Sequence, residues 1–169
     1  MSIDYNVFLK DSAKISISDF ENYAYQLGYK IKMYPLEDFL SHSGFLPFNI
    51  CPDFMKHPLP YDSMLSGFEL YFDEYDAENY DENFTVQMNC PRLAALLCFS
   101  GMDSLELFVT LLFAGYLCRC CNGVFYDPQE DQFISDAHVL EEAVKEYENY
   151  LNDPANKSSL VFHEFKGFD

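Results

Sequence analysis

Basic residues are scarce in this sequence. Its 169 residues include 10 Lys and Arg against 28 Asp and Glu, which gives a formal net charge of −18. Small soluble domains usually carry a net charge of magnitude about 2–8, so the excess of acid is large. Phosphate backbones are repelled by such a surface, which excludes nucleic acids as direct ligands, and anionic membranes are disfavoured for the same reason. The charge favours a basic protein partner.

The sequence also lacks recognisable targeting and membrane segments. No basic stretch followed by an apolar run stands near the N-terminus, so we expect no signal peptide. The uninterrupted apolar part of the most apolar region, residues 107–117, is too short to span a bilayer. The six cysteines are most simply explained as reduced, buried thiols. We therefore expect a soluble cytoplasmic protein that does not bind membranes.

Catalytic and metal-binding motifs are missing as well. The sequence contains no G-x-S-x-G, P-loop or G-x-G-x-x-G pattern, and its four histidines are widely separated. Cys118 and Cys121 have the C-x-x-C spacing, but they fall at the predicted C-terminal end of a helix, where the dipole does not favour thiolates. The EF-hand spacing and its central glycine are also lacking. We expect no enzymatic activity, no cofactor and no metal site.

Tryptophan is absent, but other aromatic residues are abundant. The chain has 17 Phe and 13 Tyr, and 49% of its residues are apolar. This composition excludes a disordered acidic tail. A chain of this length buries roughly two thirds of its extended surface on folding, which is enough for a core without metal ions or disulfides. We expect a single globular domain over residues 1–169.

Hydrophobic periodicity predicts a β–α–β start. Residues 4–9 and 29–34 alternate as strands do, and between them Ser18 and Glu21 have capping-box spacing. The helix is expected to present Phe20, Tyr23, Ala24 and Leu27 on one face and to stop at Gly28.

The remainder of the chain alternates between predicted strands and helices. Four prolines in residues 44–60 predict an irregular surface excursion. Strands are predicted at 67–72, 84–88, 93–99 and 124–126, with a turn at 127–129 and a short edge strand at 160–162. A buried helix from Asp103 to about Asn122 and an amphipathic helix from Ser135 or Asp136 to 152–154 complete the pattern. The fold class is α+β, with about three helices packed on a mixed or antiparallel sheet.

The most informative feature is an acidic segment, defined here as residues 71–82. Six carboxylates alternate with aromatic residues, and the stretch 73–82 contains no base. The charges would steer association with a basic cleft, and the tyrosines would fill pockets of the partner. A solvated loop without function is the alternative. The candidate partner-binding residues are Tyr71, Asp73, Glu74, Tyr75, Asp76, Glu78, Tyr80, Asp81 and Glu82.

A family resemblance points in the same direction. Residues 93–134, an apolar strand and a buried helix followed by Gly123-Val124-Phe125-Tyr126-Asp127-Pro128-Gln129, resemble small bacterial proteins of polymorphic-toxin neighbourhoods. In size, acidity and α+β character the chain is similar to immunity proteins of contact-dependent growth inhibition systems. The resemblance implies a cytosolic protein that neutralises a matched basic toxin domain, often a nuclease that attacks tRNA or DNA. It transfers no functional residues.

Two other hypotheses remain open at the level of sequence. A nucleic-acid mimic, as in anti-restriction or anti-CRISPR proteins, would space its acids like phosphates over an elongated surface and inhibit many DNA-binding proteins. A small hydrolase or metal-binding enzyme would need a site that the sequence does not show assembled. The oligomeric state is left undecided, since strand edges or surplus aromatic residues would also support a homodimer.

Overall fold

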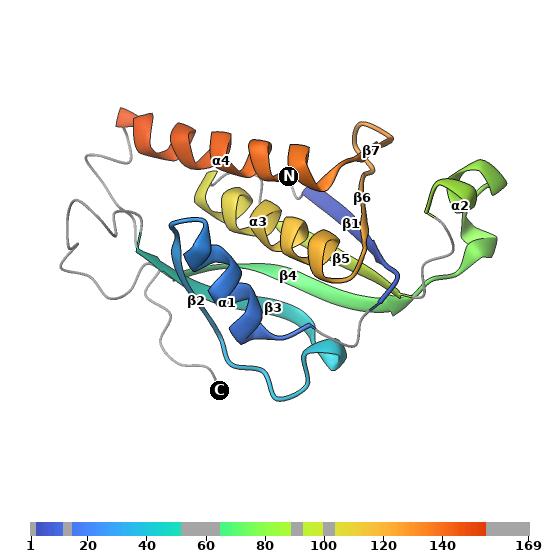
Figure 1. Cartoon of the computed structure of the whole chain (residues 1–169), viewed down its shortest axis with the longest axis horizontal. Helices are drawn as coiled ribbons and strands as arrows, with labels where there is room; N and C mark the ends of the chain where they lie inside the picture. The colour runs from blue at the N-terminus through green and yellow to red at the C-terminus, as the bar shows by residue number, and fades with distance from the viewer. Residues whose placement is uncertain (1–2, 12–14, 52–64, 89–92, 100–103, 155–169) are drawn as a thin grey trace.

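One antiparallel sheet organises the protein. The computed structural model describes residues 3–11, 15–51, 65–88, 93–99 and 104–154 (Figure 1). In the described part, seven strands pair in the order β2-β3-β4-β5-β1-β6-β7, and every pair is antiparallel. The strands are β1 (Ile3–Leu9), β2 (Lys30–Met33), β3 (Ser43–Cys51), β4 (Leu65–Glu74), β5 (Leu93–Phe99), β6 (Val124–Asp127) and β7 (Gln132–Ile134).

Three long helices lie together on one face of this sheet. They are α1 (Ile17–Gln26), α3 (Ser104–Cys120) and α4 (Asp136–Asn152), and Figure 1 shows α4 stacked beyond α3. A fourth, α2 (Glu82–Met88), lies apart at the end of β4, preceded by the short 3₁₀ turn η2 (Ala77–Asn79). A second 3₁₀ turn, η1 (Phe39–Ser41), precedes β3. The predicted α+β class with an antiparallel sheet is confirmed.

The main core lies between the sheet and α3. Because side chains alternate along a strand, Val7 and Leu9 of β1 point toward the helices and are fully buried, whereas Phe8 points to the opposite face. Helix α3 is apolar on all sides, and its residues from Phe108 to Leu117 are buried by the sheet below and the neighbouring helices. The predicted strand 93–99 and the predicted buried helix are both confirmed, although Asp103 lies outside the described residues.

The start of α1 differs from the prediction. The N-cap is Ser16, whose Oγ accepts a hydrogen bond from the Asp19 amide at 3.1 Å and donates one to Asp19 Oδ2 at 2.6 Å. The Ser18–Glu21 capping box is therefore wrong. Glu21 instead turns to the sheet edge, where its Oε1 accepts from the Met33 amide at 2.9 Å. The predicted stop is confirmed, since Gly28 adopts φ +93°, a region that favours glycine.

The predicted irregular excursion is wrong for its first half. Residues up to Cys51 form β3, and Pro47 lies within it opposite Gly67. A proline is tolerated here because its missing N–H lies beyond the last residue of β2, while the Pro47 carbonyl still accepts from the Tyr34 amide at 3.0 Å. Residues 52–64, the second half of that prediction, lie outside the described residues.

The predicted strand at 84–88 is also wrong, because these residues belong to α2. Asp81 caps this helix: its Oδ1 accepts from the Phe84 amide at 2.7 Å. Phe84, Val86 and Met88 alternate with polar residues as in a strand, but Val86 is 71% exposed in the helix.

The last helix begins where the sequence predicts, but the strand before it was not predicted. Ser135 caps α4 as expected, and its Oγ accepts a hydrogen bond from the His138 amide. Strand β7 was missed because three residues are too few for a periodic pattern. On α4 the buried positions are Val139, Ala143 and Tyr150, whereas Leu151 near the end of the helix is 43% exposed. The predicted edge strand at 160–162 lies outside the described residues.

Candidate functional site

The acidic segment runs from the end of β4 through η2 into the first turn of α2 (Figure 1). Its acids are exposed, while its aromatic side chains are partly buried. Tyr71 lies on the face of β4 away from the helices, and its hydroxyl donates to Glu69 Oε2 at 2.8 Å. The structure thus brings the nine predicted residues into one continuous stretch at one end of the sheet.

Phe8 anchors this segment to the sheet. Its ring meets the rings of Tyr75, Tyr80 and Phe84 edge-on, with centroid distances of 5.8, 5.8 and 5.6 Å. Tyr80 and Phe84 also stack on each other at 4.5 Å and 12°. Edge-to-face and offset stacked pairs add about 0.5–1.5 kcal/mol each beyond the area that they bury. These ring contacts hold the acidic segment against the sheet.

The packing changes the role that the sequence had indicated for two tyrosines. The rings of Tyr75 and Tyr80 contact Phe8, and the Tyr75 hydroxyl hydrogen-bonds with Thr85 Oγ1 at 2.9 Å. Burial raises the pKa of Tyr80, with a smaller contribution from Tyr75. Both tyrosine rings therefore pack against the sheet and hold the acidic segment in place.

The six carboxylates divide into two groups. Asp76 and Asp81 cap local structure: Asp76 Oδ1 accepts from the Glu78 amide at 3.0 Å, and Asp81 caps α2. The others are exposed, and none makes a hydrogen bond or ion pair with a described residue. These four carboxylates, free to meet a partner's cations, are Asp73, Glu74, Glu78 and Glu82.

A second feature is a pocket of about 310 Å³ between the helices and the short strands β6 and β7. Its apolar walls are formed by Tyr5, Phe125, Leu107, Leu111, Ile134 and Val139. Four carboxylates, from Asp127, Glu130, Glu142 and Glu146, also line it, together with His138 and Gln132. Among the described residues, no Lys or Arg lines it.

This pocket was not predicted from the sequence. Glu142 and Glu146 belong to the acidic positions of α4, and the structure shows them half-buried beside the pocket. The signal was the spacing of Val139, Glu142 and Glu146, which are three and four residues apart and therefore share a helix face. The sequence indicated only a turn at Asp127, and the structure places this residue in the same pocket lining as Glu142 and Glu146 of α4.

The negative charge of this pocket is concentrated near Tyr5. Burial, together with the smaller effects of the charges of Asp127, Glu146 and Glu142, raises the pKa of Tyr5 to about 12. The Tyr5 ring lies 5.0 Å from the ring of Phe125. An aromatic wall and several carboxylates therefore meet at one place.

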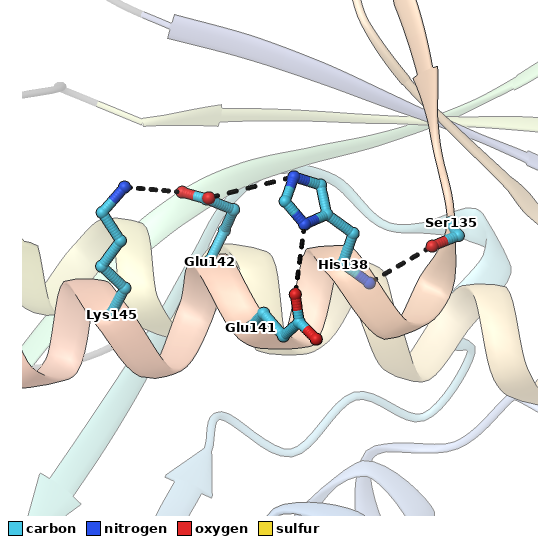
Figure 2. Close-up of polar contacts among 5 residues, drawn as sticks. All are labelled: Ser135, His138, Glu141, Glu142 and Lys145. Atoms are coloured by element: carbon cyan, nitrogen blue, oxygen red, sulfur yellow. Dashed lines mark hydrogen bonds and ion pairs between the residues drawn. The ribbon is translucent and has the colours of Figure 1, made fainter.

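The rim formed by α4 carries a small polar network (Figure 2). His138 Nδ1 lies 3.4 Å from Glu141 Oε2, and His138 Nε2 lies 3.9 Å from Glu142 Oε1. Lys145 Nζ approaches Glu142 Oε2 at 3.5 Å. All of these side chains are substantially exposed, and exposed ion pairs contribute only about 0–1 kcal/mol. Glu142 is therefore only weakly paired with His138 and Lys145.

The cysteines at the end of α3 fit the buried-thiol interpretation. Cys118 and Cys121 are buried, and burial raises the pKa of each thiol to about 12. Burial also raises the pKa of Cys120, although this side chain is only partly buried. Among the described residues, no group of three or more His, Cys, Asp or Glu side chains is arranged to hold a metal ion.

These thiols should react very slowly with iodoacetamide in the folded protein. The thiolate is the reactive form, so a pKa near 12 leaves about one thiol in 10⁴ reactive at pH 8, before steric protection is counted. We expect peptide mass spectrometry to show Cys120 alkylated first and Cys118 and Cys121 protected. Denaturation in guanidinium is the control and should equalise the three rates. Rapid modification of Cys118 in the folded state would contradict the burial.

Comparison with known proteins adds no assignment: no protein-family model, curated protein or solved structure matches the chain. No helix in the described ranges is long and apolar enough to cross a membrane.

Proposed function

We propose that the protein is an immunity-type binding module, which neutralises a basic toxin domain by binding it through the acidic segment. The observation that carries this proposal is the arrangement of Asp73, Glu74, Glu78 and Glu82, which are exposed carboxylates without described partners on a segment held by the aromatic cluster around Phe8. A nuclease such as a tRNase is the kind of toxin proposed, because an enzyme that binds RNA needs a basic cleft.

The fixed position of the segment supports binding. Ordering a flexible loop on association costs free energy, and a preorganised surface avoids that cost. Because the aromatic rings hold the backbone, the carboxylates face solvent before any partner arrives. The net charge of −18 adds a long-range attraction that raises the rate of encounter with a basic protein.

Neutralising the unpartnered acids should slow association without unfolding the protein. The variant Asp73→Asn/Glu74→Gln/Glu78→Gln removes three charges and spares the capping residues Asp76 and Asp81. We expect the association rate with the captured partner to fall by about 10-fold at low salt, and its dependence on salt to become weaker. Stopped-flow or surface-based kinetics at two salt concentrations would measure both effects.

A matched control separates the local surface from the total charge. Glu37→Gln/Asp38→Asn/Glu148→Gln also removes three exposed carboxylates, none of which lies in the acidic segment. The partner itself would come from affinity capture in a lysate of the native host at physiological salt. Equal kinetics for the two variants would refute the segment as the interface, and capture of many unrelated DNA-binding proteins would favour a nucleic-acid mimic.

A further inference from the structure

The pocket between α4 and β6–β7 combines two kinds of lining. Aromatic and aliphatic side chains line it together with four carboxylates. Ligand pockets are typically about 300–1,000 Å³ in volume, so a pocket of about 310 Å³ fits a small ligand or a single side chain.

Asp127 supplies the most informative contact. Its side chain lines the pocket although the residue is only 9% exposed. Oδ1 accepts hydrogen bonds from the amides of Gln129 and Glu130, at 2.8 and 3.4 Å. Oδ2 makes no hydrogen bond or ion pair with any described residue. No fully buried side-chain oxygen among the described residues lacks a hydrogen-bond partner, so Oδ2 is reached by solvent and can pair with a cation or accept from a donor.

The other residues that line the pocket indicate which kind of cation would fit it. Glu142 and Glu146 are one turn apart on α4, while Asp127 and Glu130 come from β6 and the turn after it. Tyr5 and Phe125 present rings to the same space, and aromatic faces attract organic cations that lie within about 6 Å. Carboxylates distributed around apolar walls suit a cationic head on an alkyl stem, which buries its stem against the walls.

We propose that this pocket binds an alkylammonium or alkylguanidinium group, with its charge among Asp127, Glu142 and Glu146 and its stem against Tyr5 and Phe125. None of these residues belongs to the acidic segment, so the site is independent of the proposed function. Such a group is carried both by free amines and by Lys or Arg side chains.

Calorimetric titration with n-butylguanidinium and n-butylammonium chloride tests the proposal. Titrations use the full chain at constant ionic strength, with sodium chloride as the reference cation and n-butanol as the uncharged stem. We expect one organic cation to bind per chain, and n-butanol to bind at least 10-fold more weakly. Amide chemical shifts should change in α4 and β6–β7. Absence of saturable binding, or stronger binding of calcium chloride than of either organic cation, would overturn the proposal.

Two variants separate the pocket from the general negative charge. Glu142→Gln/Glu146→Gln should weaken binding at least 10-fold, whereas Glu37→Gln/Glu148→Gln, which removes the same charge elsewhere, should leave it unchanged. Equal weakening by both pairs would refute the pocket. A peptide with one Arg between glycines shows which kind of molecule carries the bound group. If the peptide binds as tightly as butylguanidinium, the ligand is a protein side chain. If the peptide binds more weakly, the ligand is a free small molecule.

Discussion

Replacing Phe8 with alanine is expected to lower the free energy of unfolding by about 3–5 kcal/mol, the usual cost of truncating a buried phenylalanine. Phe8 is fully buried, but on the face of the sheet opposite the main core. Tyr75, Tyr80 and Phe84 all pack edge-on against it, and Tyr126 lies 6.4 Å away. Loss of this ring therefore removes the common support of η2 and α2.

The Phe8→Ala variant should show a local effect in addition to the global one. We expect hydrogen exchange of the α2 amides to accelerate more than exchange in α3, since regions with few other contacts open first. Denaturant unfolding measures the change in the free energy of global unfolding. Phe8→Leu is the matched control, because it retains most of the volume and loses only the ring geometry. A loss below about 1 kcal/mol in Phe8→Ala would show that the cluster does not hold the segment.

Replacing Phe113 with alanine is expected to cost a similar amount, about 3–5 kcal/mol, through the main core. Phe113 of α3 is fully buried and lies at the centre of the helical face. Its ring centroid is 4.9 Å from Phe20 of α1, 5.7 Å from Phe39 and 5.4 Å from Phe68 of β4. One ring thus joins α1, α3 and the sheet.

Phe8→Ala and Phe113→Ala should differ in which segments lose protection from hydrogen exchange. In Phe113→Ala, exchange should accelerate throughout α1, α3 and the central strands, whereas α2 should change no more than the rest. Association with a basic partner should be preserved in the fraction that remains folded, because the acidic segment does not contact Phe113. Phe113→Leu is the volume-retaining control. A selective loss of protection in α2 would contradict the separation of the two clusters.

Elements with long or regular patterns were predictable. The strand at 93–99, the buried helix α3 and the amphipathic helix α4 each repeat their apolar residues often enough to identify the element. Shorter elements were not, since Phe84, Val86 and Met88 satisfy a strand pattern and a short helix equally well. The N-cap of α1 was ambiguous for a related reason: Ser16 and Ser18 are both capping residues, and the hydroxyl of Tyr116, 100 positions away, holds Ser16.

The charge, the aromatic content and the acidic segment follow from the order of residues alone, because they depend on composition and on neighbours along the chain. Only the tertiary structure decided which of these side chains face solvent. Tyr75 and Tyr80 turn inward because β1 places Phe8 beneath them, and Glu142 and Glu146 border a pocket because α4 packs beside β6. Local periodicity cannot predict such contacts, because they join residues that are distant in sequence.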